Sequence, residues 1–233
     1  MKTKQNENIC SNCGTNNPFY KKNCTNCKHY LRATVVNIDL WKTIWLLFEN
    51  PSKAFTDIIF AEHKNFLVPL LTLLSIKIYL TAFIIQSVLL SLSKTTNYLI
   101  YNTLILCGIY IVSIVLFSFF FTKITNKTRF KDNVSLITYS FIPIIFSLII
   151  LTPIEYGIFG EYWFTHNPSP LLIKKNLAYI LFFLEGIMSL LSLIFLYVAI
   201  SIQTSSRIFS IIIAVIFMGT ILSEIFFIPH LLF

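Results

Sequence analysis

The sequence predicts an all-α integral membrane protein with five transmembrane helices, preceded by interfacial amphipathic helices and a small N-terminal module. Its 233 residues are 56% hydrophobic and only 12% charged, whereas soluble domains carry about 25% charged residues. Five apolar runs are long enough to cross a bilayer, and all but one of the Lys and Arg residues lie outside these runs. The predicted parts are residues 1–32, 33–65 and 66–233.

The N-terminal module contains two Cys-x-x-Cys pairs separated by ten residues: Cys10, Cys13, Cys24 and Cys27. Four thiolates can surround Zn²⁺ tetrahedrally, and no coordination position then remains open for catalysis. Two disulfides are the alternative, but they are disfavoured in a reducing cytoplasm. The spacing therefore predicts a zinc ribbon over residues 1–32 with a structural Zn²⁺. Gly14 suits the turn after the first pair, and Lys28 suits the second turn less well.

Residues 33–65 predict two amphipathic helices. Leu40, Trp41, Ile44, Trp45 and Phe48 form an apolar stripe at helical spacing. A stripe with two tryptophans suits a helix that lies in the headgroup plane. Asn50 is predicted to cap a second helix, with Pro51 at its first position. The second stripe consists of Ala54, Phe55, Ile58 and Ile59. Packing of both helices on the end of the bundle is the alternative.

The five predicted spans are Phe66–Leu92, Tyr98–Thr122, Val134–Leu151, Leu177–Ala199 and Ile208–Ile228. The third is the shortest, and Pro143 inside it predicts a kink. Four spans with one re-entrant segment remain an alternative.

The distribution of Lys and Arg predicts the orientation. Lysines precede the first span, and the second connection carries Lys123, Lys127, Arg129 and Lys131. On the opposite side, Lys174 and Lys175 are offset by Glu155 and Glu161. By the positive-inside rule, the N-terminus lies in the cytoplasm and the C-terminus outside.

Two charged residues are predicted to meet inside the membrane. At about 1.5 Å per residue, Lys77 lies roughly 16 Å into the first span and Glu185 roughly 12 Å into the fourth. A bare ammonium at this depth costs at least about 2.5 kcal/mol, so a partner is expected. The Lys77–Glu185 pair would fix helix register or form a polar site. Glu155 and Glu224 are expected near the outer ends and match less well.

Three segments resemble the membrane domain of the Yip-one family: "ENPSKAFTDII", "FLVPLL" and "VSLITYSFIPIIF". The resemblance covers Leu40–Phe233, and its most specific piece runs from Tyr139 to Pro143. It implies five spans, a cytosolic N-terminus and interaction with Ypt/Rab GTPases, although the family's Asp-Leu-x-Gly-Pro motif is not completed after Asp39. A ribbon before such a domain resembles a prokaryotic arrangement, which implies the bacterial inner membrane.

The sequence favours two functions. One is a membrane scaffold or adaptor, linked to membrane organisation or trafficking, whose cytoplasmic ribbon docks an unidentified protein. The other is a transporter or channel with a midplane polar site at Lys77 and Glu185. The adaptor is preferred because it uses every feature above. No enzyme is expected, because catalytic motifs are missing. The net charge of +8 is spread over the connections, so the lipid bilayer rather than nucleic acid is the expected partner. A homo-oligomer stays open.

Overall fold

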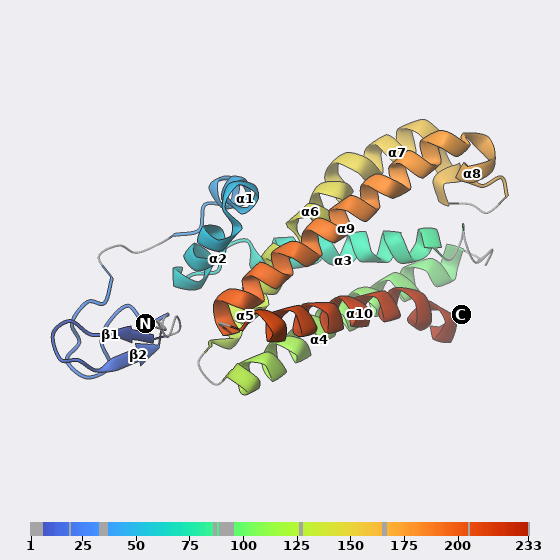
Figure 1. Cartoon of the computed structure of the whole chain (residues 1–233). Coiled ribbons are helices and arrows are strands. Elements are labelled where there is room, and N and C mark those ends of the chain that lie inside the picture. Colours follow the sequence, from blue (N-terminus) through green and yellow to red (C-terminus); the bar gives the residue numbers. More distant parts are fainter. Residues whose placement is uncertain are drawn as a thin grey trace.

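In the computed structural model, the N-terminal module stands at one end of a bundle of long helices (Figure 1). The structure describes residues 7–18, 20–32, 37–85, 88, 96–125, 128–164, 167–204 and 206–232. The C-terminus lies at the opposite end of the bundle from the module. This separation of the two ends is what an odd number of spans requires.

The N-terminal module, defined here as residues 7–32, is built from two hairpin turns. Strand β1 (Glu7–Ile9) pairs antiparallel with β2 (Asn16–Pro18). A second turn is closed by the isolated bridge between Asn23 and Tyr30. Among its described side chains, only Cys10, Asn17 and Cys24 are buried. The module therefore has almost no apolar core of its own.

Helices α1 (Leu40–Glu49) and α2 (Pro51–Phe60) each begin after a residue whose side chain caps the helix. Asp39 caps α1 by accepting a hydrogen bond from the Lys42 N–H at 2.9 Å. Asn50 caps α2 by accepting one from the Lys53 N–H at 3.1 Å. Pro51 occupies the first turn of α2, where a missing N–H costs nothing. The predicted start of the second helix is confirmed.

The two helices use their apolar stripes differently. The stripe of α2 is buried against α5 and α9, and its members are Ala54, Phe55, Ile58 and Ile59. On α1, Leu47 packs inward, whereas Trp41 and Trp45 are each 75% exposed. Packing on the bundle therefore holds for α2, and an outward tryptophan face remains on α1. Such a face is typical of a helix at the membrane interface.

We expect Trp41 and Trp45 to be quenched by brominated lipids when the protein is reconstituted. The chain has three tryptophans, so the variant Trp163→Phe isolates these two. Quenching should be stronger with bromines near the headgroup than with bromines at the chain end. The matched variant Trp41→Phe/Trp45→Phe keeps only Trp163, which is fully buried, and should show little quenching. Equal quenching of both variants would contradict the interfacial position of α1.

In the described part of the chain, five helices are long and apolar enough to cross a membrane: Leu67–Ile84, Leu104–Thr125, Ile142–Phe164, Lys175–Thr204 and Arg207–Phe227. They belong to α3 (Leu67–Ile84), α4 (Thr96–Thr125), a composite third helix, α9 (Lys175–Thr204) and α10 (Arg207–Leu232). A multi-pass membrane protein is thereby confirmed. Residues 86, 87 and 89–92 of the first predicted span lie outside the described part of the chain.

The predicted third span, Val134–Leu151, is wrong in its position. Helix α5 (Phe130–Ser140) precedes the span and is enclosed by protein, since α3, α4 and α9 all contact it. Its polar residues, including Asp132, Asn133 and Ser135, are buried. The membrane-length helix starts only at Ile142 and continues to Phe164. The sequence-based estimate began too early because it counted apolar residues that face protein.

The third span is a chain of short helical segments rather than one regular helix. These are α6 (Ile142–Phe146), the π-helical η2 (Ser147–Leu151), α7 (Thr152–Phe159) and the 3₁₀ turn η3 (Gly160–Phe164). The chain breaks at Phe141, before Pro143, where a kink was predicted. The wider π-turn carries the helix past Pro153, which offers no N–H. Residues 154–164, predicted as an outer loop, are therefore helical, and the short α8 (Pro170–Ile173) follows.

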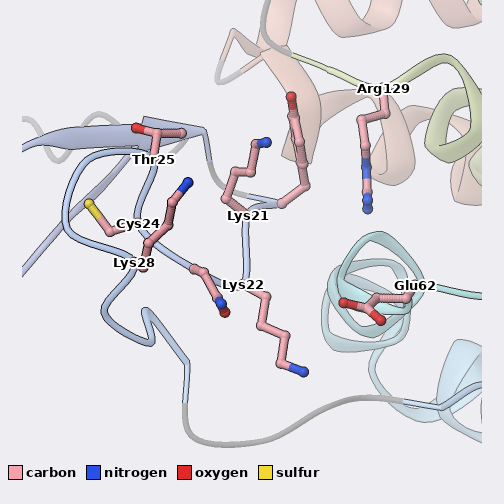
Figure 2. Close-up of a pocket in the computed structure, with 9 residues that line it drawn as sticks. Lys21, Lys22, Cys24, Thr25, Lys28, Glu62 and Arg129 are labelled. Carbon is pink, nitrogen blue, oxygen red and sulfur yellow. The ribbon is translucent and has the colours of Figure 1, made fainter.

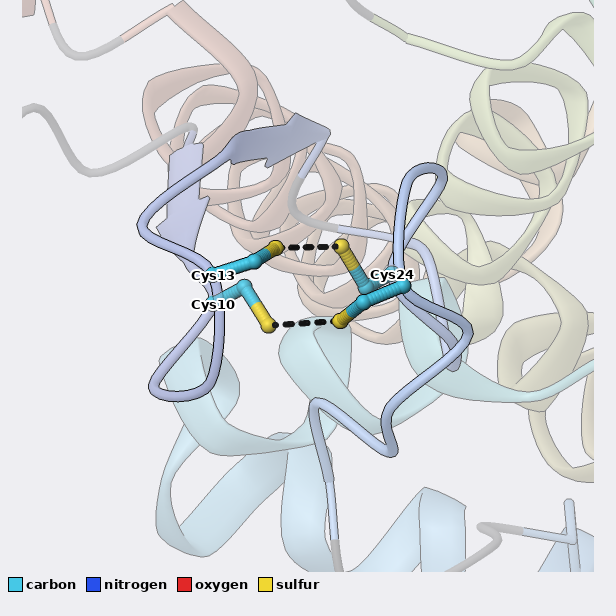
Figure 3. Close-up of side chains that lie close together, drawn as sticks. Cys10, Cys13 and Cys24 are labelled. Carbon is cyan, nitrogen blue, oxygen red and sulfur yellow. Dashed lines mark hydrogen bonds between the residues drawn. The ribbon is translucent and has the colours of Figure 1, made fainter.

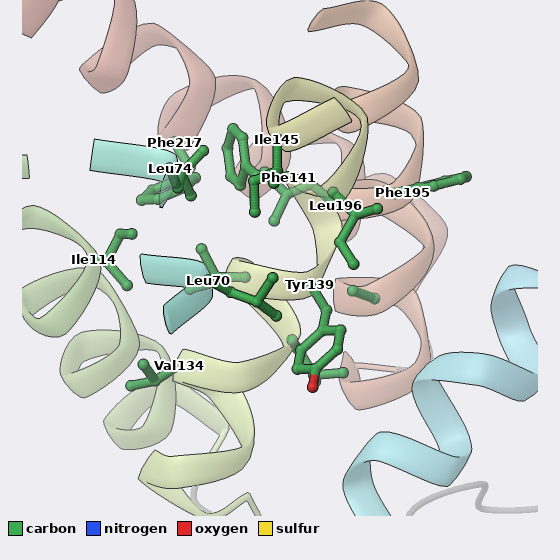
Figure 4. Packing of buried hydrophobic residues seen from close by; sticks show 14 of the residues in the cluster. Leu70, Leu74, Ile114, Val134, Tyr139, Phe141, Ile145, Phe195, Leu196 and Phe217 are labelled. Carbon is green, nitrogen blue, oxygen red and sulfur yellow. The ribbon is translucent and has the colours of Figure 1, made fainter. Parts of the chain in front are cut away.

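The main core lies where the broken third helix meets its neighbours (Figure 4). Phe217 of α10 contacts Phe117 of α4, with ring centroids 4.4 Å apart, and Phe141, at 6.0 Å. A second, smaller core, at the end of the bundle away from the N-terminal module, surrounds Trp163, which stacks on Phe182 with ring centroids 4.9 Å apart. The two cores fix the relative positions of the helices that carry the buried polar residues.

Candidate functional site

The four predicted ligand cysteines meet in one cluster (Figure 3). The sulfur atoms of Cys10 and Cys27 are 3.5 Å apart, as are those of Cys13 and Cys24. All four sulfurs lie within 4.8 Å of one another. Tetrahedral metal–thiolate bonds of about 2.3 Å place sulfurs roughly 3.8 Å apart. The donor set therefore fits a metal ion, and these residues could hold one.

The two halves of the cluster have the same backbone geometry. The N–H of Gly14 donates to the Cys10 carbonyl at 2.9 Å, and that of Lys28 to the Cys24 carbonyl at 3.2 Å. Gly14 has φ of +70° and Lys28 has φ of +62°. The second turn thus takes the left-handed conformation although its residue is a lysine. Each turn aims backbone N–H groups at the sulfur of its first cysteine, which favours a thiolate.

The surroundings of the cluster shift the pKa values of its thiols in opposite directions. Hydrogen bonding with Thr15 lowers the pKa of Cys13 to about 6, whereas burial raises the pKa of Cys10 to about 11. The buried Asn17 accepts hydrogen bonds from the Thr25 N–H at 2.8 Å and its hydroxyl at 2.9 Å. The Asn17 amide also donates to the Cys24 sulfur at 3.5 Å. Asn17 therefore ties β2 to the second turn and fixes the distance between the cysteine pairs.

We expect Lys28→Gly to tighten metal binding and Gly14→Ala to weaken it. A left-handed backbone costs a residue with a Cβ atom about 1–2 kcal/mol, which corresponds to roughly fivefold or more in affinity. Titration of the reduced protein with Co²⁺, whose thiolate complexes absorb visible light, measures both changes. Equal affinities for the two variants would contradict the folded geometry of the turns.

Two arginines join the N-terminal module to the membrane domain. The Arg32 guanidinium donates to the Tyr20 carbonyl at 2.9 Å and lies 4.0 Å from the centre of the Phe60 ring on α2. Arg129, just before α5, lies 4.5 Å from the centre of the Tyr20 ring. The same Arg129 donates to the Ile59 carbonyl at 2.9 Å. Tyr20 is thus held between one arginine of each part.

A basic cavity of about 690 Å³ opens at this junction (Figure 2). Lys21, Lys22 and Lys28 line it from the module, and Arg129 and Glu62 line it from the membrane domain. Its walls therefore carry four cations and one carboxylate. Such a wall attracts anionic groups from solution, most strongly at low salt.

A buried charge cluster that the sequence did not predict fastens α2, α3 and α5 below the cavity. Lys64 lies 2.9 Å from one oxygen of Asp132, and Arg129 lies 2.7 Å from the other. Asp132 is 1% exposed and the Lys64 side chain 5%. Burial lowers the pKa of Lys64, and the Asp132 charge opposes that shift. Lys64 also donates to the Ala61 carbonyl at 2.8 Å, so its ammonium is well partnered.

Inside the membrane domain, the structure brings Lys77 and Glu185 together. The Lys77 ammonium lies 2.6 Å from a Glu185 oxygen and 3.1 Å from the Thr152 hydroxyl. The Lys77 side chain is 2% exposed and the Glu185 side chain 22%. Lys77 is the tenth residue after the first residue of α3, about 15 Å along the axis. The predicted contact between the first and fourth spans is present.

Glu155 was expected near the outer end of the bundle, and this expectation is wrong. Because the third span extends to Phe164, Glu155 lies one turn beyond Thr152 and is 1% exposed. It faces Glu185, Lys77 and Trp163. Both of its oxygens are buried without a hydrogen-bond partner in the described part of the chain. The polar centre therefore has three ionisable members. Glu224, by contrast, bonds to Ser113 between α10 and α4.

The two residues of the suspected family motif have structural places. Tyr139 is fully buried, and its hydroxyl donates to the Asn65 carbonyl at 3.1 Å, which fixes the start of α3 against α5. Pro143 is buried in the first turn of α6. No protein-family model, curated protein or solved structure matches the chain. The resemblance to the Yip-one family stays a prediction.

Proposed function

We propose that the protein is a multi-pass membrane adaptor whose zinc-bound N-terminal module, on the cytoplasmic side, docks an acidic segment of a protein partner. The observation that carries this proposal is the basic cavity between the module and the membrane domain. An occupant of this cavity would contact both parts at once. Docking would therefore depend on the module being folded and on its position above α2 and α5.

The donor set supports zinc as the ion. Four thiolates are soft ligands that select Zn²⁺ or iron–sulfur chemistry over hard cations such as Mg²⁺. A bound Zn²⁺ would cross-link the two turns of the module and replace the apolar core that it lacks. Because no fifth donor is needed, the role of the ion is structural. A cytoplasmic position suits this chemistry because thiols stay reduced there.

The charge distribution and the exposed tryptophan face of α1 support a position of the module on the cytoplasmic side. Lys21, Lys22, Lys64, Arg129 and Lys131 all lie at the end of the bundle that carries the module. The positive-inside rule places such an end in the cytoplasm. The tryptophan face of α1 would rest on the same leaflet. The resemblance to the Yip-one family supports a role in membrane organisation or trafficking, at the inner membrane in a bacterium.

Zero-length cross-linking in membranes tests the adaptor proposal. A water-soluble carbodiimide joins carboxylates to lysine amines, so an acidic segment in the cavity should be linked to Lys21, Lys22 or Lys28. Capture should be lost in Lys21→Glu/Lys22→Glu and in Cys10→Ser/Cys13→Ser. The matched charge reversal Lys42→Glu/Lys53→Glu, on exposed positions of α1 and α2, should keep it. The proposal would be contradicted if all three variants gave the same cross-links. It would also be contradicted if the captured complexes were held by nucleic acid alone.

A second candidate is transport across the bundle, and the buried centre at Lys77, Glu155 and Glu185 favours it. Intramembrane ionisable groups often mark the path of a proton or solute. Proton flux into liposomes that contain the purified protein and a trapped pH-sensitive dye tests this function. Flux that exceeds that of empty liposomes and disappears in Glu155→Gln would support it. Flux equal to that of empty liposomes would exclude proton transport and leave the adaptor function unaffected.

A further inference from the structure

The charges of the buried polar centre do not balance. Lys77 supplies one positive charge, and Glu155 and Glu185 supply two carboxyl groups. The Lys77 ammonium is already engaged by Glu185 at 2.6 Å and Thr152 at 3.1 Å. If both carboxyls were ionised, one negative charge would remain in an apolar interior. An uncompensated buried charge costs several kcal/mol even after relaxation.

Glu155 is the group on which this excess charge would fall. Its two oxygens are buried and receive no hydrogen bond in the part of the chain that the structure describes. Trp163 faces it from η3, and its indole N–H is likewise buried. Glu185 is more exposed and has the ammonium as its direct partner. Two neighbouring carboxyls in such surroundings do not both ionise.

We propose that Lys77, Glu155 and Glu185 form a proton-binding site inside the membrane domain, in which Glu155 is a neutral carboxylic acid at neutral pH. The bound proton lies on a Glu155 oxygen and is directed at the Glu185 carboxylate. The Lys77 ammonium, 2.6 Å from Glu185, supplies the counter-charge for that carboxylate. The site then carries no net charge, as its surroundings require.

A metal cation fits the site less well than a proton does. Hard cations take about six or more oxygen ligands. The site offers two carboxyl groups and the Thr152 hydroxyl, and Lys77 already occupies one carboxylate and that hydroxyl. Lys77 would also repel a second cation. A proton needs only one oxygen and one acceptor, both of which are present.

This inference deepens the transport candidate, but it concerns binding alone and does not require that protons cross the bundle. Covalent labelling of the full-length protein tests it. A hydrophobic carbodiimide reacts with a protonated carboxyl: the acid O–H adds across one C=N bond, its proton moves to nitrogen, and the acyl group migrates to give a stable N-acylurea. The adduct has the mass of the whole reagent, so peptide mass spectrometry locates it.

In the wild type at neutral pH, Glu155 should be labelled and Glu185 should not. In Lys77→Met, which removes the positive charge, both carboxyls should be neutral and both should be labelled. The exposed Glu161, near the same end of the bundle, is the internal control and should stay unlabelled, because it is not part of the buried centre whose charges do not balance. No adduct on Glu155, or equal labelling of both carboxyls in the wild type, would overturn the proposal.

Infrared spectroscopy gives a second readout that needs no reagent. The wild type should show the C=O band of a neutral carboxylic acid in apolar surroundings, and Glu155→Gln should lose it. Glu224→Gln removes the other carboxyl between transmembrane helices and should leave the Glu155 band in place. Loss of Glu155 labelling on addition of NaCl at constant pH would identify a cation site instead and overturn the proton assignment. Because flux is not measured, failure of transport and failure of proton binding remain distinguishable.

Discussion

Removal of the metal is expected to unfold the N-terminal module while the membrane bundle keeps its helices. The module buries few of its side chains, and zinc in comparable small modules supplies about 10–16 kcal/mol at neutral pH. No other interaction in the module approaches this value. Incubation with a strong chelator should therefore make residues 7–32 sensitive to protease. The helical circular dichroism should change little, because it comes from the bundle.

Cysteine variants separate metal loss from general damage. Cys10→Ser/Cys13→Ser should be protease-sensitive without chelator and should bind no zinc by elemental analysis. Cys107→Ser is the matched control, because Cys107 lies on α4 outside the cluster and should leave one zinc per chain. A module that resists protease in the metal-free state would show that the four cysteines are not a folding site.

Replacing Lys77 with methionine is expected to be the most destabilising single change in the membrane domain. It leaves the Glu185 carboxyl without its partner at 2.6 Å, so this group must either stay charged in apolar surroundings or take up a proton, and both cost free energy. Breaking a buried ion pair in this way costs about 3–5 kcal/mol. Thermal unfolding in detergent, followed by circular dichroism, should show a clear fall in Tm. The exposed Lys123→Met, near the end of α4, should change the Tm little.

A double-mutant cycle shows whether the loss comes from the pair. In a Glu185→Gln background, adding Lys77→Met should cost much less stability than it does in the wild type. The Glu185 charge that Lys77 neutralises has already been removed. The two changes should therefore be strongly non-additive. If the two losses simply add, Lys77 and Glu185 do not interact in the folded protein.

Sequence patterns predicted the sites that depend only on the spacing of residues along the chain or on the depth of a residue in a membrane-spanning helix. The four cysteines follow from two short pairs, and the cap at Asn50 follows from local chemistry. Lys77 and Glu185 could be matched because both lie in regular helices, where depth is proportional to residue number. These predictions needed no knowledge of how the helices pack.

Glu155 was missed because its helix is irregular. The apolar pattern predicts that the third span ends at Leu151, just before Pro153, which leaves Glu155 beyond the span. The π-turn η2 instead carries the helix through the proline. Whether a proline ends a helix or is accommodated depends on the neighbours that hold the backbone, here α6 and α9. That information is absent from a local pattern.

The cluster of Lys64, Arg129 and Asp132 was missed for a different reason. Lys64 and Arg129 are far apart in the sequence, and both were counted as charges that set membrane orientation. Asp132 begins an apolar segment, which concealed that α5 is enclosed by protein rather than lipid. The cavity above this cluster was unpredictable too, because it exists only where the module meets the bundle.

The most direct test of a cytoplasmic, zinc-bound docking module is to determine on which side of the membrane the N-terminal module lies. A biotin-acceptor peptide can be fused either before Met1 or after Phe233, and each fusion produced with a biotin ligase confined to the cytoplasm. If the module lies in the cytoplasm, the N-terminal fusion should be biotinylated and the C-terminal fusion should not. Biotinylation of only the C-terminal fusion would place the cysteines outside the reducing compartment. That result would contradict both the zinc-bound module and the cytoplasmic docking site.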